Sequence, residues 1–207
     1  NNYADHIYTL SKGISWITFQ NECAAIRIDD QLCKQGKGIT LYSSFKQNLK
    51  GDKMYTVFED SEGDEWILTN KGISIIGKKQ VDSDFPFQYI KEADGIIYLV
   101  SQSDKLASYN FKTRQFKFIE IPYHVSMINE VKKFDSNTLL LATDNGLIIY
   151  KIKEKEFQLI DIRTSTQPSN VVQSVYQDHY KELWIFPQTT GVIRYNPSTK
   201  EMQHLFT

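Results

Sequence analysis

Residues 171–206 read VVQSVYQDHYKELWIFPQTTGVIRYNPSTKEMQHLF, and the fold of the chain can be worked out from this stretch. Four short runs rich in apolar and β-branched residues predict four β-strands. Segments rich in turn-forming residues separate them, namely DHYKE, PQTTG and NPSTKE. The runs cover 171–177, 183–186, 192–195 and 202–206. One small sheet is predicted, with consecutive strands joined by tight turns.

The same order of runs and turns recurs four more times along the chain. EWILTNKGISII at 65–76 and TLLLATDNGLIIY at 138–150 repeat the middle hairpin. A repeat of about 40 residues with four strands is the unit of a β-propeller. The sequence therefore predicts an all-β propeller segment over 1–207. Its five four-stranded blades are expected at about 6–50, 54–80, 86–121, 126–162 and 171–206.

One large residue near the start of the second strand marks each repeat. The markers are spaced by 50, 32, 41 and 45 residues, and they are Trp16, Trp66, Tyr98, Leu139 and Trp184. In the last three repeats a Tyr follows the marker after eleven residues, as expected if the turn fixes the hairpin register. Gly72, Gly146 and Gly191 lie in this turn, where a positive φ is needed. Because a marker should pack against the next blade, Trp66 and Trp184 are predicted to be core residues.

Composition places the chain among ordinary globular proteins. Of its 207 residues 41% are hydrophobic and 24% charged, and the formal net charge is -1, so no nucleic-acid contact is expected. The longest apolar runs are far shorter than the ~20 residues of a membrane helix. NNYADHIYTL at the start lacks the features of a signal peptide, so a mature or excised piece is expected. Cys23 and Cys33 could pair or remain thiols, which leaves the redox compartment open.

Two stretches carry a resemblance to a known family. VFEDSEGDEWILTNKGISII at 57–76 and VYQDHYKELWIFPQTTGVIRY at 175–195 share an acidic turn, Trp-Ile, a Thr-x-x-Gly or Thr-Gly turn and a final apolar strand. This pattern resembles the two-component regulator propeller repeat in the periplasmic sensor domains of Bacteroidetes hybrid two-component proteins. The likeness covers about 6–206, with departures such as Leu68 where the family usually has Gly.

The resemblance implies a larger protein around this chain. Family members usually close seven blades into a ring, so the chain is expected to be part of one ring. The implied location is periplasmic, in the extracytoplasmic part of an inner-membrane protein that reaches the membrane only through a downstream region. The implied function is to detect polysaccharide-derived oligosaccharides and to signal through a homodimer to a cytoplasmic histidine kinase. No enzyme activity is expected in this segment.

A carbohydrate-active propeller enzyme, a lyase or a hydrolase, is the alternative function. EDSEGDEW at 59–66 lacks the Ser and Asp that a sialidase-type turn needs. The four histidines are scattered, so no metal site is predicted, and no cofactor-binding motif is found. The carboxylates of 59–65 are expected to cap the turn and stay solvated rather than act as acid and base. No catalytic residue is therefore predicted.

A ligand site is expected on the face where the loops of the propeller meet. Turns between second and third strands share this top face with the connections between blades, IPYHVS at 121–126 and DIRTSTQPSN at 161–170. These connections carry Tyr123, His124, Arg163 and Gln167. Aromatic rings stack on sugars and guanidinium groups hold carboxylates or sulfates, so an acidic or neutral oligosaccharide is predicted. The alternative is that the four residues only solvate two long loops.

Overall fold

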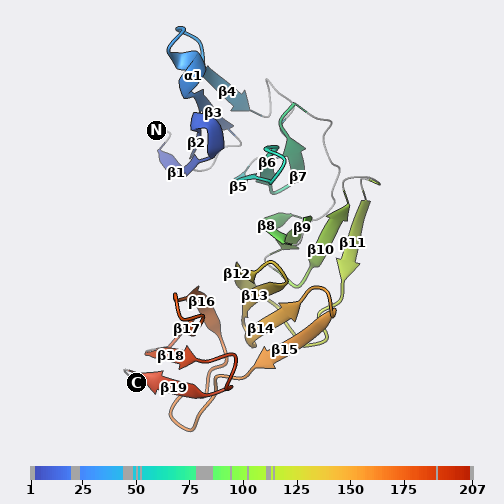
Figure 1. The fold of residues 1–207 in the computed structure, drawn as a ribbon, viewed down its shortest axis with the longest axis vertical. Helices are drawn as coiled ribbons and strands as arrows, with labels where there is room; N and C mark the ends of the chain where they lie inside the picture. Colours follow the sequence, from blue (N-terminus) through green and yellow to red (C-terminus); the bar gives the residue numbers. More distant parts are fainter. Residues whose placement is uncertain are drawn as a thin grey trace. The chain divides into compact units, whose positions relative to one another are not determined.

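Five antiparallel sheets follow one another along the described chain (Figure 1). The structure is a computed structural model. It describes residues 3–19, 24–43, 49, 51, 53–77, 86–93, 95–101, 103–110, 113, 115–189 and 191–205. The predicted all-β fold of propeller-type sheets is confirmed. The chain divides into two units, Asn1–Ile90 and Lys91–Thr207.

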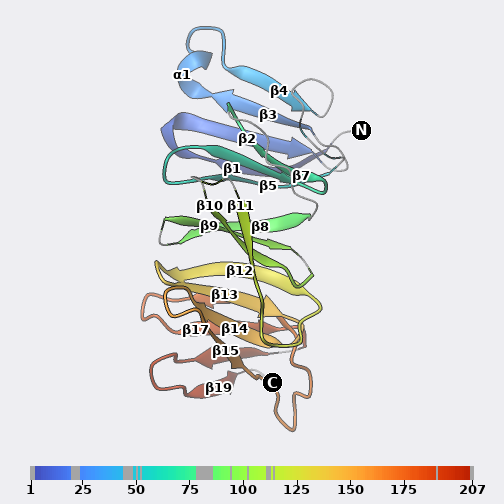
Figure 2. The ribbon, with the colours of Figure 1, turned by 90° about the vertical axis from the view of Figure 1, so that its right-hand side faces the viewer.

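The first unit contains two sheets, which lie against each other in Figure 2. Their strand orders are β1-β2-β3-β4 and β5-β6-β7. A short 3-10 helix, η1 (Ser11–Gly13), links β1 to β2, and one helical turn, α1 (Asp30–Cys33), follows β3. The strands are β1 (Ala4–Thr9), β2 (Ile14–Phe19), β3 (Ala24–Asp29), β4 (Ile39–Ser43), β5 (Met54–Glu59), β6 (Glu65–Thr69) and β7 (Gly72–Ile75).

The second unit contains sheets with the orders β11-β10-β9-β8, β12-β13-β14-β15 and β16-β17-β18-β19. The last of these agrees with the four predicted runs to within one residue. The boundary between the units falls inside β8. The strands are β8 (Phe87–Ala93), β9 (Ile96–Ser101), β10 (Leu106–Asn110), β11 (Gln115–Ile119), β12 (Ile128–Asp135), β13 (Thr138–Thr143), β14 (Gly146–Lys151), β15 (Glu156–Ile160), β16 (Val172–Gln177), β17 (Leu183–Pro187), β18 (Val192–Tyr195) and β19 (Met202–Leu205).

One Asp both holds the first turn of a repeat and binds the marker Trp. Oδ1 of Asp60 accepts hydrogen bonds from two backbone N–H groups of its turn, and Oδ2 accepts from Nε1 of Trp66 at 2.8 Å. Asp178 makes the same three bonds, with Nε1 of Trp184 at 3.0 Å. The expectation that the carboxylates of 59–65 stay solvated is therefore wrong for Asp60. It is buried because one carboxylate serves three donors.

A Thr hydroxyl closes the turn between the second and third strands in two repeats. Oγ1 of Thr143 donates to the carbonyl of Gly146 at 2.7 Å and accepts from the N–H of Asn145 at 3.1 Å. Thr69 makes the same pair of bonds, donating to the carbonyl of Gly72 at 3.1 Å. The glycines of this turn have positive φ, as predicted. The Thr-x-x-Gly pattern is thus a structural signature of the hairpin.

The marker predicted at Leu139 is wrong by one residue. In the second and fourth repeats the first strand has a register shift near its start. The first paired residue after the shift lies opposite Leu68 of β6 in the second repeat and opposite Ala142 of β13 in the fourth. The marker Trp66 stands two residues before Leu68, so Leu140 is its equivalent in the fourth repeat. The sequence could not separate two adjacent buried leucines. The spacing of eleven residues from Leu139 to Tyr150 equals that of the third and fifth repeats only because the hairpin of the fourth repeat is one residue shorter than theirs.

Each sheet has two unlike faces. We call the face that carries the marker the marker face and the opposite one the reverse face. In the first unit Trp16, on the marker face of β1–β4, packs with Val57 and Ile67 on the reverse face of β5–β7. The corrected markers are Trp16, Trp66, Tyr98, Leu140 and Trp184.

The sheets of the second unit pack by the same rule. Tyr98, on the marker face of β8–β11, meets the ring of Tyr150 edge-on, with the centroids 6.3 Å apart. Leu140, on the marker face of β12–β15, packs with Val175 and Ile185 of β16–β19. Each of these interfaces joins a marker face to a reverse face.

One carboxylate fastens the two sheets of the first unit together. Glu65 accepts hydrogen bonds from Nε1 of Trp16 at 2.6 Å and from Nε and Nη2 of Arg27 at 2.9 and 2.7 Å. The hydrogen bonds that Arg27 donates to Glu65 raise the pKa of Arg27, so the guanidinium stays charged. Glu65 is therefore another carboxylate of 59–65 that leaves solvent, because it replaces water with an ion pair between sheets.

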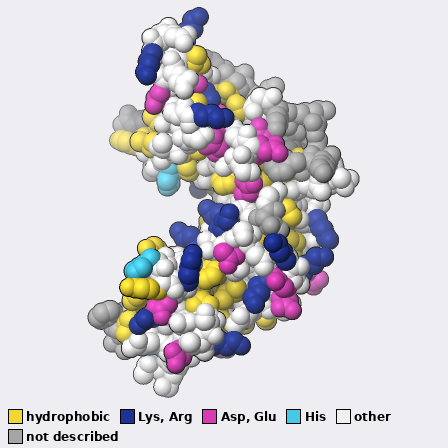
Figure 3. Space-filling view, in the orientation of Figure 1, with side chains coloured by type: hydrophobic (Ala, Val, Ile, Leu, Met, Phe, Trp, Pro, Cys, Tyr) yellow, Lys and Arg dark blue, Asp and Glu magenta, His cyan; other side chains and the backbone are white. Residues whose placement is uncertain are grey.

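Burial differs among the three tryptophans. Trp16 and Trp66 are fully buried, whereas Trp184 is half-buried on a marker face that the described residues leave largely open. Cys33 is half-buried at the end of α1, and Cys23 lies outside the described residues. Within the described ranges, no helix is long and apolar enough to cross a membrane. Basic and acidic side chains are interspersed over the face seen in Figure 3.

Candidate functional site

Two asparagines tie together three loops of the second unit, at the face where the sequence predicts a ligand site. Nδ2 of Asn145 donates to the carbonyl of His124 at 3.0 Å, and its Oδ1 accepts from Nδ2 of Asn170 at 3.0 Å. Oδ1 of Asn170 accepts in turn from the N–H of Ile162 at 2.9 Å. The three loops are the connection 121–127, the turn 143–146 and the connection 161–171.

Further hydrogen bonds fix the backbone of the same loops. The carboxylate of Asp144 accepts from the N–H of Ser126 at 3.1 and 3.2 Å, and the N–H of Asp144 donates to the carbonyl of Met127 at 3.0 Å. The N–H of Gly146 donates to the carbonyl of Asn170 at 2.7 Å. The backbone of these loops is thus held in place, and a fixed backbone reduces the entropy lost when a loop binds a ligand.

Tyr123 and His124 are presented differently from each other. The hydroxyl of Tyr123 donates to the carbonyl of Phe157 at 3.0 Å, which fixes a half-buried ring against β15. His124 is exposed, and its backbone carbonyl is held by Asn145. Because the Tyr123 hydroxyl already donates to a backbone carbonyl, Tyr123 would contact a ligand through its ring.

Arg163 is not an isolated cation. Its Nε lies 3.0 Å from each carboxylate oxygen of Asp161, and its Nη2 also bonds to that carboxylate. These hydrogen bonds lower the pKa of Asp161 and raise the pKa of Arg163, so both groups stay ionised. The pair brings donors and acceptors together at the surface while the two charges largely cancel.

Gln167 is buried, although the sequence placed it among the surface residues of its loop. Its backbone is bound on both sides to Thr164, by a carbonyl bond of 2.8 Å and an N–H bond of 3.0 Å. Its Nε2 is enclosed and has no hydrogen-bond partner among the described residues. Gln167 therefore lies inside its loop and stabilises the loop conformation. Its buried Nε2 still needs a hydrogen-bond acceptor.

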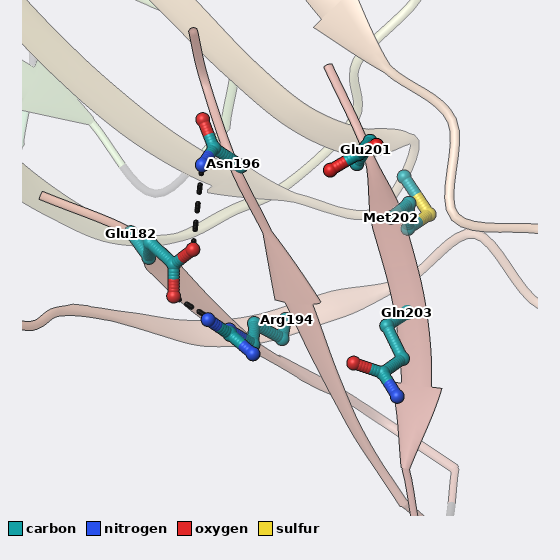
Figure 4. Close-up of a pocket in the computed structure, with 6 residues that line it drawn as sticks. All are labelled: Glu182, Arg194, Asn196, Glu201, Met202 and Gln203. Atoms are coloured by element: carbon teal, nitrogen blue, oxygen red, sulfur yellow. Dashed lines mark hydrogen bonds and ion pairs between the residues drawn. The ribbon is translucent and has the colours of Figure 1, made fainter. Parts of the chain in front are cut away.

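A second candidate is a polar pocket of about 410 Å³ on the sheet β16–β19 (Figure 4). Glu182 binds Nε of Arg194 at 2.5 Å and Nδ2 of Asn196 at 3.3 Å. Oδ1 of Asn196 accepts from two N–H groups of the following turn. These polar groups already serve the repeat, and none of the four predicted site residues lines the pocket. Its lining consists of Glu182, Arg194, Asn196, Glu201, Met202 and Gln203.

The chemistry available at the three loops is that of binding. They offer an ion pair, amide groups, an exposed imidazole and an aromatic ring on a fixed backbone. Groups of this kind hydrogen-bond and stack on small polar ligands. Within the described part of the chain, no group of three or more His, Cys, Asp and Glu side chains could hold a metal ion.

Comparisons with known proteins agree with the fold. No protein-family model matches the chain. Histidine kinase P4 of Formosa agariphila is 22% identical over 156 residues, which are 75% of this chain and 9% of that protein. The extracellular domain of the putative hybrid two-component system BT3049 of B. thetaiotaomicron matches with a TM-score of 0.70 and 16% identity, over 100% of this chain and 30% of that one.

An enzyme shares the same fold. Virginiamycin B lyase from Staphylococcus aureus matches with a TM-score of 0.71 and 18% identity, over 97% of this chain and 68% of the lyase. At such identities the likeness establishes the fold, which sensor domains and a lyase both use. The chain spans 9% of the length of the curated relative and about a third of the BT3049 domain.

Sequence reasoning missed the residues that organise the site. Asn145 and Asn170 link the loops, and Asp161 neutralises Arg163. Part of this could have been read from the chain, because Asp161 stands two residues before Arg163 in an irregular loop. The contact between Asn145 and Asn170 joins positions 25 residues apart, and no local pattern indicates it.

Proposed function

We propose that this chain is a ligand-binding segment of an extracytoplasmic sensor protein of a two-component system, and that it binds a neutral oligosaccharide. The observation that carries the proposal is the fixed cluster of the three loops, with Arg163 and Asp161 paired at its surface. The extracellular two-component domain among the structural neighbours supports a sensor rather than a transport or structural role.

The ion pair favours a neutral ligand over an acidic one. Asp161 would repel a carboxylate or sulfate brought up to Arg163, whereas the pair offers N–H donors next to carboxylate acceptors. Adjacent hydroxyls of a sugar ring need this combination of donors and acceptors. The ring of Tyr123 and the imidazole of His124 would supply the stacking surface.

Signalling would then follow from a shift in population. A ligand drives such a shift when it binds one arrangement of the sensor better than another. In the proposed role the whole protein lies across the inner membrane, with this segment in the periplasm. A homodimer would pass the change on to a histidine kinase.

Titration calorimetry against neutral and acidic oligosaccharides tests the ligand. Arg163→Ala should weaken binding of the neutral ligand by roughly 10-fold to 100-fold, the usual effect of losing a charge-assisted hydrogen bond. Lys117→Ala, which removes an exposed cation on β11, is the matched control and should bind like the wild type. Equal affinity of all three proteins would remove the loops from consideration. Release of cleaved sugar during the titration would instead favour the enzyme.

A further inference from the structure

The turn between β13 and β14 contains Asn145–Gly146, the one Asn–Gly pair in the sequence. Such a pair is open to a slow chemical change. The short side chain of Asn reaches the next backbone nitrogen, and Gly has no side chain to obstruct the approach. Asn is also among the residues that are chemically lost on heating. Whether this pair reacts therefore depends on how the fold holds it.

The reaction is deamidation, and its only co-reactant is water. The backbone nitrogen of Gly146 attacks Cγ of Asn145, and the new C–N bond closes a succinimide ring. The bond from Cγ to Nδ2 breaks, and the Nδ2 group leaves as ammonia with the proton from the Gly146 nitrogen. Water then opens the ring at either carbonyl, which leaves aspartate or isoaspartate at position 145.

Asn170 holds both reacting groups of this pair. Its backbone carbonyl accepts from the N–H of Gly146 at 2.7 Å, and its Nδ2 donates to Oδ1 of Asn145 at 3.0 Å. The carbonyl of His124 holds the leaving group, because Nδ2 of Asn145 donates to it at 3.0 Å. An N–H that donates to a carbonyl loses its proton less readily, since the hydrogen bond stabilises the protonated form. Attack of the nitrogen on Cγ is therefore disfavoured.

Hydrogen bonds and packing also restrict backbone rotation in the turn. Oγ1 of Thr143 accepts from the N–H of Asn145 at 3.1 Å and donates to the carbonyl of Gly146 at 2.7 Å. Gly146 is buried with φ 98°, and a Cβ at this position would lie 2.6 Å from the carbonyl oxygen of Ile160. Closing the succinimide ring therefore requires a local opening of the turn.

Conversion at position 145 would release one of the three loops. A carboxylate oxygen would replace the Nδ2 that donates to the carbonyl of His124, so two acceptors would face each other. The new negative charge would stand next to Asp144. In isoaspartate the main chain runs through the side chain, which lengthens a turn whose pairing of Thr143 with Gly146 fixes the hairpin. Either product loosens the connection 121–127.

We infer that Asn145–Gly146 is a deamidation site that Asn170 keeps unreactive in the folded chain, and that its conversion frees the connection 121–127 from the turn. Deamidation then acts as a slow, one-way change from fixed to loose loops. The inference concerns the chain itself and does not depend on the proposed ligand.

Incubation at mildly alkaline pH followed by peptide mass spectrometry tests the protection. Deamidation at Asn145 should be fast in urea-unfolded chain and slow in the folded wild type. Asn170→Asp keeps the acceptor for the N–H of Ile162 and removes the donor to Asn145. It should speed deamidation by roughly 3-fold to 10-fold, the usual effect of losing one hydrogen bond.

Asn129→Ala is the matched control for a general loss of stability. It removes another asparagine contact between the same two sheets, from Nδ2 to the carbonyl of Val172 at 2.8 Å, and should leave the rate at Asn145 unchanged. An equal rise in Asn129→Ala and Asn170→Asp would overturn the inference, because overall stability would then be what protects the pair. Deamidation as fast in the folded wild type as in urea, or unchanged by Asn170→Asp, would equally overturn it.

Hydrogen exchange tests the consequence of conversion. Asn145→Asp reproduces one of the two products, and circular dichroism should show that it folds. The N–H of Ser126 is bound to Asp144 in the connection 121–127, so its exchange should become faster in this variant. Exchange in β1–β4 should stay as in the wild type. Unchanged exchange at Ser126 would show that the loop stays fastened, which contradicts the inferred release.

Discussion

Lys181 occupies a backbone conformation that suits glycine. Its φ is 68°, and its N–H donates to the carbonyl of Asp178 at 3.1 Å. In the second repeat Gly63, with φ 83°, makes the same bond to Asp60 at 3.0 Å. A side chain with a β-carbon is strained in this region of φ, whereas glycine is not.

Lys181→Gly is expected to stabilise the protein by up to about 0.5–1 kcal/mol, because it relieves the backbone strain. The greater conformational entropy of glycine in the unfolded chain offsets part of this gain. Urea unfolding measures the change. Lys105→Gly is the matched control, since Lys105 lies in a turn and does not have positive φ; it should be neutral or destabilising. A loss of stability at Lys181→Gly would show that the lysine side chain contributes more than its strain.

Asp178 links the fold to pH. The hydrogen bond from Trp184 lowers the pKa of Asp178 below its ordinary value of 3.8. A carboxyl whose pKa is lower in the folded state stabilises fully above its unfolded pKa, and this contribution is lost as pH falls through the folded pKa. Acidification below about pH 4 should therefore lower the melting temperature.

Melting temperatures of Asp178→Asn across the acidic range check this expectation. The variant should lose part of the slope that the wild type shows, because Asn cannot titrate. Trp184→Phe keeps the carboxyl and removes its donor, so it should flatten the slope as well. Slopes equal to the wild type in both variants would place the pH dependence at other carboxyls.

The role of Asp60 shows what local sequence patterns could and could not reveal. Asp precedes Trp by six residues in both the second and the fifth repeats, as Asp60 before Trp66 and Asp178 before Trp184, so the shared bond was readable as a spacing. The acidic composition of the turn at 59–65 predicts solvated carboxylates instead. The partner of Glu65 could not be read, because Arg27 lies 38 residues away in another repeat.

At the scale of the strands, the burial of a marker tryptophan shows whether the marker face of its sheet is covered. Trp66 is fully buried, whereas Trp184 is half-buried. Trp66→Ala should destabilise the protein by about 3–5 kcal/mol because it leaves a cavity that the sheet cannot close. Trp184→Ala should cost less than half of that, since part of its surface already meets water. Equal losses in denaturant titrations would mean that Trp184 is covered in solution.

The hairpins were predictable because their signals are local. The Thr-x-x-Gly turns, the positive φ of their glycines and the strands of the fifth repeat all follow from residues within one turn of each other. The misplaced marker at Leu139 has a different cause. Which of the two leucines is the marker depends on how β13 pairs with β12 and on the sheet β16–β19 that packs against it. The sequence of the hairpin alone contains neither kind of information.

At the scale of the whole molecule, contacts between neighbouring repeats stabilise the fold and hold the loops of the candidate site together. Asn145 and Asn170 assemble the loops across two repeats, so the sequence predicted the face but not the groups that hold it together. Glu65 holds two sheets of the first unit in the same way. Such contacts have long sequence separation, and a scan for local patterns does not detect them.

Glu65→Ala should therefore destabilise more than its partial exposure suggests. The change leaves Nε1 of Trp16 and the guanidinium of Arg27 without their acceptor between two packed sheets. The expected loss is on the order of 2–4 kcal/mol, since removing one member of an enclosed ion pair exposes the full desolvation penalty of the other. Glu182→Ala, which breaks the solvent-facing pair with Arg194, is the matched control and should cost less. Urea unfolding followed by tryptophan fluorescence gives both values. If the two losses were equal, the Glu65 contact would be a surface pair, and apolar packing of Trp16 on Val57 and Ile67 alone would join the two sheets.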